Sequence, residues 1–345
     1  MPIGTPCQVI FVNGLWRTSQ VQSSFDHAMR KAALLYNPES GGSKQRQREL
    51  ESALTLLRSG GIEADLIPTQ SPHHAVEETR RAVEAGCDTI FAGGGDGTIH
   101  NIVQVLANSS TALAILPMGT ANALAHDIRL PLKVVAAAKA SLHSTPRRIA
   151  LGRLTCADLH GSPVTRYFVI AAGVGVDAHL FYKLHTGTKQ RMGMAAYYAK
   201  AWHLWWSYPM TRFAIEYLEA GSDAPHSADV TELMAVRIRN FGGVLQELVP
   251  GASLDRNDVR LVFCRTASRA AYLAYVTCRV LRLRLTVPGI DLFHSTRVSC
   301  RYPSPSSASP PQPKIYVEAD GELLGTLPAE ITVVPDALTL LAPPR

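Results

Sequence analysis

Gly93-Gly94-Gly95-Asp96-Gly97-Thr98 is the stretch of sequence that decides the fold. It follows the apolar run Thr89 to Ala92 and opens a segment of helical periodicity that extends to Ala107. A glycine turn between a buried strand and a helix presents unpaired backbone N–H groups, and the helix dipole adds positive potential there. The stretch therefore predicts an anion-binding turn, whereas a helix cap formed by Asp96 or Thr98 would need no ligand.

A second turn of the same kind, Pro117-Met118-Gly119-Thr120-Ala121-Asn122-Ala123-Leu124-Ala125, follows the next apolar run, Ala112 to Leu116. The carboxyl ends of parallel strands lie at one edge of an open sheet, so both turns are expected in one crevice. This placement favours a nucleoside triphosphate as the ligand. The chain has no G-x-x-x-x-G-K-[ST] loop and no H-R-D and D-F-G pair, which excludes P-loop enzymes and protein kinases.

Working outward from these turns, the alternation of short apolar runs with helix-period segments predicts a βαβ arrangement. We expect an N-terminal Rossmann-like domain with an open parallel sheet over residues 30–148, to which residues 329–345 return. Strand-like runs separated by turns predict a β-rich, sandwich-like domain over 149–328, with a Pro/Ser loop at 303–313. The nucleotide cleft is expected between the two domains. Residues 1–29 form a leader without an assigned structure.

Composition narrows the class of protein. The chain has 345 residues, of which 18% are charged and 46% hydrophobic, with a net charge of +6, and this balance excludes a disordered chain. Six scattered cysteines without a C-x-x-C pair indicate a reducing cytoplasm. No apolar run reaches the roughly 18 residues that a bilayer span needs, so a cytoplasmic protein is expected. The charge is too dispersed to indicate a nucleic-acid partner.

The paired glycine turns resemble those of the diacylglycerol kinase catalytic domain, a family that includes bacterial lipid kinases and the sphingosine and ceramide kinases. Three further segments extend the resemblance over about residues 30 to 342. Asn37-Pro38-Glu39-Ser40-Gly41-Gly42 is similar to the first nucleotide-contacting turn of the family, and Thr69 with His74-Ala75 to the second. Gly173-Val174-Gly175-Val176-Asp177-Ala178 is similar to its substrate-cleft segment.

Val317-Glu318-Ala319-Asp320-Gly321-Glu322 looks like the D-G-E element of the same family, which returns a carboxylate to the cleft. Taken alone, Asp320-Gly321 also matches a type I′ hairpin turn, which would need no role in catalysis. The order of the upstream motifs is what favours the first interpretation.

The resemblance implies a kinase that uses ATP and Mg²⁺ to phosphorylate a hydroxyl group of a membrane lipid, either diacylglycerol or a sphingoid or ceramide-like lipid. It implies that Asp96 orients the hydroxyl group or accepts its proton, and that Glu322 is a metal ligand or an alternative base. Asp177 would recognise the lipid headgroup, and Asp255 and Asp320 are candidate metal ligands. The candidate nucleotide-binding residues are Asn37, Ser40, Thr69, Gly94, Gly95, Gly97, Thr98, Gly119, Thr120, Asn122 and Arg191.

Three departures from the family pattern leave alternatives open. Ala123 follows Asn122 where many bacterial relatives have Asp, Asn101 stands where an acid is usual, and the loop from Asp255 to Asp258 lacks consecutive aspartates. The alternatives are an NAD kinase-like enzyme and a catalytically weak module that binds lipid or nucleotide. The acceptor lipid and the oligomeric state, including a homodimer, also stay open.

Two segments bear on how the protein reaches a lipid. Tryptophans beside basic residues suit the headgroup interface, although packing on one helix face explains them equally well. Arginines on an apolar segment suit anionic lipid, and a solvated helix face explains them equally well. We expect a cytoplasmic protein peripheral to the membrane. The residues concerned are Trp202, Trp205 and Trp206 in the first segment and Arg279, Arg282 and Arg284 in the second.

Overall fold

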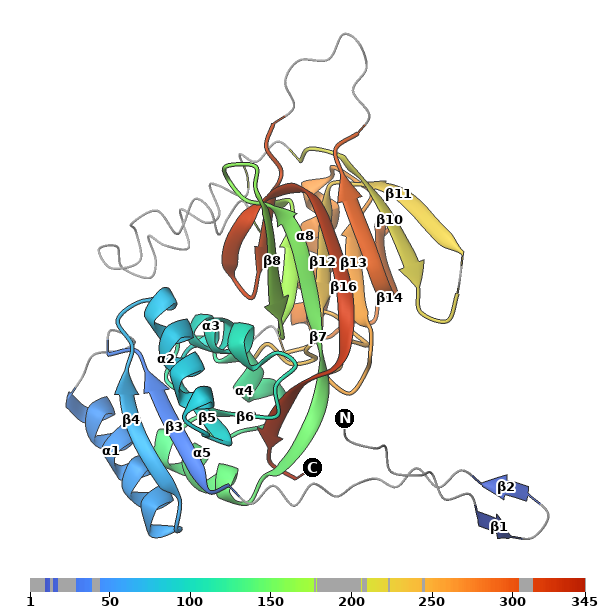
Figure 1. Ribbon diagram of the computed structural model, residues 1–345. Helices are drawn as coiled ribbons and strands as arrows, with labels where there is room; N and C mark the ends of the chain where they lie inside the picture. The colour runs from blue at the N-terminus through green and yellow to red at the C-terminus, as the bar shows by residue number, and fades with distance from the viewer. Residues whose placement is uncertain are drawn as a thin grey trace.

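The computed structural model of the chain has two lobes joined by two long strands (Figure 1). It describes residues 29–38, 44–176, 178, 206, 210–222, 224–243, 246–303 and 313–344, together with a short hairpin in the leader, β1 (Ile10–Val12) and β2 (Leu15–Arg17). The predicted fold class, a parallel α/β lobe followed by a β-rich lobe, is confirmed.

The N-terminal lobe is built on four parallel strands in the order β6-β5-β3-β4. Strands β5 and β6 are buried along their whole length, as expected for a sheet covered on both faces. Helices α1 and α5 pack together, as do α2 and α3. The elements are β3 (Lys31–Tyr36), α1 (Lys44–Ser59), β4 (Glu63–Pro68), α2 (Pro72–Glu84), β5 (Thr89–Gly94), α3 (Asp96–Leu106), β6 (Ala112–Pro117), α4 (Ala123–Asp127) and α5 (Val134–Leu142).

The C-terminal lobe is antiparallel and has its own core, which includes Phe168, Phe213 and Phe263. Helix α8 follows β13. No helix in the described part of the chain is both long and apolar enough to cross a membrane. The elements of this lobe are β8 (Pro163–Phe168), β9 (Ala171–Val174), β10 (Phe213–Glu219), β11 (Pro225–Val230), β12 (Glu232–Val236), β13 (Val259–Cys264), α8 (Arg269–Val280), β14 (Ile290–Arg301) and β15 (Tyr316–Ala319).

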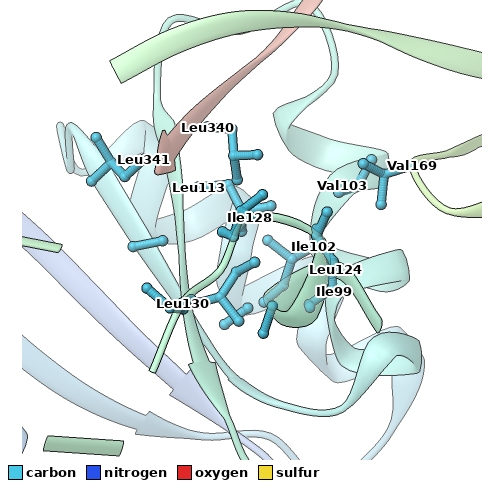
Figure 2. Close-up of a cluster of buried hydrophobic side chains, with 14 of the residues drawn as sticks. Ile99, Ile102, Val103, Leu113, Leu124, Ile128, Leu130, Val169, Leu340 and Leu341 are labelled. Atoms are coloured by element: carbon cyan, nitrogen blue, oxygen red, sulfur yellow. The ribbon is translucent and has the colours of Figure 1, made fainter. Parts of the chain in front are cut away.

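Two strands connect the lobes. β7 (Thr145–Ala157) and β16 (Glu322–Ala342) pair antiparallel from the register Thr326 with Ala157 to Ala342 with Thr145. The far end of β16 then adds to the N-terminal sheet, because Thr339 pairs in parallel with Ala112 of β6. Figure 2 shows the result, in which residues from β16 lie in the same apolar cluster as residues from β6, α3 and α4. The labelled members of the cluster are Ile99, Ile102, Val103, Leu113, Leu124, Ile128, Leu130, Val169, Leu340 and Leu341.

The apolar residues from Val164 to Ala172 predict a strand, but this run does not form one continuous strand. It divides into β8 and β9, because the backbone N–H groups of Val169 and Ile170 at the break point to the Asp320 carboxylate. The sequence also predicts a helix over residues 191–206, of which only Trp206 is described. Most of the Pro/Ser loop lies outside the described residues.

Candidate active site

A cavity of about 610 Å³ lies at the carboxyl edge of the N-terminal sheet, where the C-terminal lobe covers it. Its walls come from both lobes, because the α3 turn meets the β15–β16 hairpin there. This is the crevice in which open parallel sheets bind their ligands. The predicted site residues that line the cavity are Asn37, Thr69, Gly95, Asp96, Gly97, Thr98, Thr120, Asp320 and Glu322.

The two glycine turns touch each other through their backbones. A Cβ atom on Gly119 would lie 2.4 Å from the Cα of Gly95, and one on Gly95 would lie 3.1 Å from the Cα of Gly119. The N–H of Met118 donates to the carbonyl of Gly94 at 3.0 Å. A Cβ atom on Gly94 would lie only 2.2 Å from Oγ1 of Thr98. Close packing therefore requires these glycines whether or not a phosphate is bound.

The Asn122 side chain stabilises the second glycine turn by hydrogen bonds within that turn. The backbone of Asn122 is left-handed, with φ of 49°, and its Oδ1 accepts the N–H of Gly119 at 2.8 Å. Its Nδ2 donates back to the carbonyl of Gly119 at 2.9 Å. The Asn122 side chain and the Gly119 N–H are therefore both used within the turn, and their nucleotide contacts stay a prediction. Thr120 and Ala121 of the same turn line the cavity instead.

Asp96 is the first residue of α3 and also caps α4. Its carboxylate accepts the N–H of Ala123 at 3.2 Å and that of Leu124 at 3.5 Å. Burial raises the pKa of Asp96 above its ordinary value, against the lowering effect of these two N–H groups, and the charge of Asp320 raises it further. A carboxyl group with a raised pKa that lines a cavity is suited to accept a proton.

Asp320 and Gly321 form the turn of the β15–β16 hairpin. Their φ angles are 49° and 84°, and Ala319 pairs with Glu322 across the turn, so the hairpin interpretation is right for the backbone. The turn also lies at the cavity wall, as the D-G-E interpretation expected.

The Asp320 side chain has no exposed surface and its carboxylate is held by backbone donors. It accepts N–H groups from Val169 at 3.0 Å, Ile170 at 2.8 Å and Ala171 at 3.1 Å. Nδ1 of His100 lies 3.4 Å from its Oδ2. These contacts fix the β8–β9 break against the hairpin, so Asp320 acts as a structural clamp, and its role as a metal ligand stays a prediction.

The second candidate metal ligand, Asp255, lies outside the cavity. Its Oδ1 is 2.6 Å from Nη1 of Arg147, in a partly exposed ion pair. Among the residues that the structure describes, no group of three His, Cys, Asp or Glu side chains is placed to hold a metal ion. Protein-bound Mg²⁺ commonly uses one or two carboxylates together with substrate phosphates. The cavity carboxylates that fit this pattern are Asp96 and Glu322, since a Cβ atom on Gly97 would lie 2.9 Å from Oε1 of Glu322.

Two residues near the site were missed by the sequence analysis. Glu318 is 4% exposed, accepts the N–H of Gly321 at 2.8 Å and covers Gly173, where a Cβ atom would lie 2.8 Å from its Oε1. Its only sequence signal was its position next to the D-G-E element. Arg46 donates to the carbonyl of Met118 at 2.6 Å, so α1 supports the second glycine turn. An arginine in an amphipathic helix gives no signal of such a contact.

Three predicted site residues, Ser40, Asp177 and Arg191, lie outside the described residues, as do Trp202 and Trp205. The two residues before Asp177, Gly175 and Val176, are described. Gly175 has φ of 116°, and the buried Glu232 accepts the N–H of Val176.

Comparison with known proteins agrees with this geometry. Residues 31–154 match the family model of the diacylglycerol kinase catalytic domain. The predicted resemblance to this family is confirmed. The diacylglycerol kinase of Bacillus subtilis (strain 168) is 26% identical over 305 residues, which cover 88% of this chain and 93% of that protein. The diacylglycerol kinase of Staphylococcus epidermidis (strain ATCC 12228 / FDA PCI 1200) is 25% identical over 316 residues, or 91% and 92% of the two chains.

The fold is also found in a solved structure. A diacylglycerol kinase from Bacillus anthracis str. Sterne matches with a TM-score of 0.65 and 16% sequence identity, over 91% of this chain and 97% of that one. The predicted enzyme class, a kinase of the diacylglycerol kinase type, is the class named for the relatives in sequence.

Proposed function

We propose that this protein is an ATP-dependent lipid kinase that transfers the γ-phosphate to a hydroxyl group of a membrane lipid, with Mg²⁺ as the metal ion. The observation that carries the proposal is the single cavity in which Asp96, at the start of α3, faces a hairpin that carries Glu322. The resemblance to diacylglycerol kinases over most of the chain supports the lipid acceptor. Diacylglycerol and a sphingoid or ceramide-like lipid are the acceptor classes.

The α3 turn is the proposed site of the ATP phosphates. The first N–H groups of a helix have no partner within the helix, and the dipole favours an anion there. Gly97 and Thr98 in the first turn of α3 line the cavity, as does Thr120 of the second glycine turn. Arg191 keeps its predicted role as a phosphate contact. Bound Mg²⁺ would neutralise charge on the β- and γ-phosphates, with Asp96 or Glu322 as its protein ligand.

Asp96 is the proposed proton acceptor. As the lipid hydroxyl oxygen attacks the γ-phosphorus, its proton passes to the Asp96 carboxylate, and the bond between the γ-phosphorus and the bridging oxygen of ADP breaks. The raised pKa of Asp96 brings it closer to the working pH, which suits this role. Glu322, which lies over Gly97, is the alternative base. Asp177 keeps its predicted role at the lipid headgroup.

Apolar side chains also line the cavity. Ile170, Met234 and Phe241 contribute to its wall from the C-terminal lobe, together with the carboxylates of the β15–β16 hairpin. A lipid acceptor has a polar headgroup and an apolar body, and this lining offers contacts to both. The mixed lining supports a lipid acceptor, which such an enzyme would meet at the cytoplasmic surface of the membrane.

The test is transfer of labelled phosphate from ATP to diacylglycerol, sphingosine, ceramide or monoacylglycerol in mixed micelles, with NAD as a further acceptor. We expect a labelled lipid, and a loss of about 100-fold or more in Asp96→Asn, in line with the loss of a general base. Asp158→Asn, in the exposed β7–β8 turn, is the matched control. Labelled NAD would support the NAD kinase-like alternative, and ATP binding without any transfer would support a binding module.

A further inference from the structure

The segment that follows α8 exposes several large apolar side chains. Residues 279–285 read Arg-Val-Leu-Arg-Leu-Arg-Leu. Leu281, Leu283 and Leu285 are 61%, 43% and 60% exposed, and Val280 is 37% exposed. These four side chains are half of the eight exposed large hydrophobic residues in the described part of the chain. Such a concentration marks an interaction surface rather than ordinary scatter.

The same segment borders a broad, positively charged groove of about 1200 Å³. Six arginines line the groove against three acidic residues, which leaves a net charge of +3. Among the residues that the structure describes, the exposed Arg129 and Arg284 have no ion-pair partner. The six arginines are Arg129, Arg239, Arg260, Arg279, Arg282 and Arg284.

Arg279 holds the leucines in place. Its Nη2 donates to the carbonyls of Leu283 at 2.6 Å and Leu285 at 3.0 Å, and its guanidinium lies 5.5 Å from the ring centroid of Tyr275. Arg282 donates from Nη2 to Oε1 of Gln246 at 2.6 Å. The leucines are therefore presented by a turn that the fold supports, which lowers the entropy lost on binding.

We propose that the groove and residues 279–285 form a docking surface for an anionic lipid bilayer. Arginines attract the phosphate headgroups, and the leucines between them enter the boundary between headgroups and acyl chains. Exposed leucines distinguish this surface from a nucleic-acid site, which would pair its cations with stacking aromatic side chains. The inference deepens the proposed function, since it names the surface by which a lipid kinase meets its substrate.

The docking surface adjoins the candidate active site. Asn240 lines the groove, and its neighbour Phe241 lines the catalytic cavity. A small apolar cavity of about 100 Å³ lies between them and shares Tyr275 with the groove. It also shares Met234 with the catalytic cavity. A bilayer bound at the groove would thus lie beside the site of phosphoryl transfer.

The test is flotation of the full chain with vesicles of phosphatidylglycerol and phosphatidylcholine, compared with vesicles of phosphatidylcholine alone. The first variant, Arg282→Gln with Arg284→Gln, removes two positive charges. We expect it to bind anionic vesicles at least about tenfold more weakly, since each arginine near such a surface contributes about fivefold. The second variant, Leu281→Ser with Leu285→Ser, should also lose most of its binding.

The matched control is Arg153→Gln with Arg166→Gln, which removes the same charge from two exposed side chains, one on β7 and one on β8. We expect this control to float like the unchanged protein. Three results would overturn the proposal: equal flotation with both kinds of vesicle, equal loss in the control, or unchanged flotation in both test variants. A test variant with a lowered melting temperature would be replaced by its single substitutions.

Vesicle binding is measured without ATP, so this test is separate from the test of activity. Phosphate transfer to short-chain diacylglycerol in detergent micelles should be kept in both test variants, because neither touches the catalytic cavity. Flotation without any transfer by the unchanged protein would count against the proposed function and leave the docking surface standing. Phosphate transfer by the unchanged protein without flotation would count against the docking surface and leave the proposed function standing.

Discussion

Asp96 serves two purposes with one carboxylate, since it caps α4 and lines the cavity. Because its pKa is raised, the folded protein holds this proton more tightly than the unfolded chain does. Above the pKa of the folded state, Asp96 is ionised while buried, which lowers the free energy of unfolding. The free energy of unfolding rises again as the pH falls through that pKa. Asn at this position can still accept the N–H of Ala123 but cannot take a proton.

The first prediction concerns the acid limb of the pH profile. Protonated Asp96 cannot accept the lipid proton, so kcat/KM should rise with pH through the pKa of Asp96 in the free enzyme. Since that pKa is raised, the midpoint should lie above the ordinary aspartate value of 3.8. The measurement is kcat/KM against pH on a micellar lipid. A midpoint at or below 3.8 would contradict the role of Asp96.

The second prediction compares the two aspartates that the sequence offered as metal ligands. Asp320→Ala leaves three buried N–H groups unpaired, so we expect a loss of about 3 kcal/mol or more in the free energy of unfolding. Asp255→Ala breaks a partly exposed ion pair and should cost about 1 kcal/mol or less. Urea unfolding measures both. A similar loss in the two variants would show that Asp320 is not a clamp.

At the scale of elements, the two glycine turns behave as one unit because Gly95 and Gly119 meet through their backbones. The sequence predicted each turn from its own strand and helix. It could not predict the contact between them, since the two glycines are brought together by the pairing of β5 with β6. The same limit explains why the hydrogen bond between Gly119 and Asn122, which stabilises the second turn, was not predicted.

The third prediction separates the two roles that glycine has in these turns. Gly119→Ala would place a Cβ atom 2.4 Å from a backbone atom, so we expect weaker folding and weaker ATP binding together. Gly97→Ala meets only the end of the Glu322 side chain, which can move. We expect this variant to keep its melting temperature and lose activity. Calorimetric unfolding and ATP titration distinguish the two, and equal destabilisation would contradict the assignment.

Regular periodicity explains which elements were predictable. Helix α3 and strands β5 and β6 follow the expected runs closely, because their burial is set by one local pattern. The long strand β7 and strand β14 were not predicted, since polar residues interrupt both and their pairing is with distant partners. Arg237 shows the same limit, because four carbonyl groups from other segments surround this buried guanidinium, whose pKa burial lowers to about 10.

At the scale of the whole molecule, β7 and β16 make the two lobes depend on each other. The predicted cavity residues Asp96 and Glu322 meet only because β16 begins at the hairpin and ends in the N-terminal sheet. The resemblance placed these residues in one cleft, whereas local patterns could not, because more than 200 residues separate them. The domain limits inferred from the sequence stay a proposal, since β16 belongs to both sheets.

The fourth prediction tests this dependence. Leu340 of β16 is fully buried in the N-terminal core (Figure 2), so Leu340→Ala should lower the free energy of unfolding by about 2–5 kcal/mol. Hydrogen exchange should rise in both lobes, because the shared strand carries the loss across. Leu159→Ala, at a 42% exposed position, is the control and should change little. Faster exchange confined to the N-terminal lobe would show that the lobes unfold independently.

The position of β16 in the chain has a consequence for synthesis of the protein. Its partner β6 is translated more than 220 residues earlier, since Thr339 pairs with Ala112. At roughly 5–20 residues per second, the ribosome needs about 10–45 s to reach the pairing residues. During that interval the apolar edge of β6 has no permanent neighbour, and the nascent chain lacks the hairpin with Glu322. That edge is thus exposed on the nascent chain for that time, and the cavity in which we propose phosphoryl transfer is incomplete until this strand has emerged.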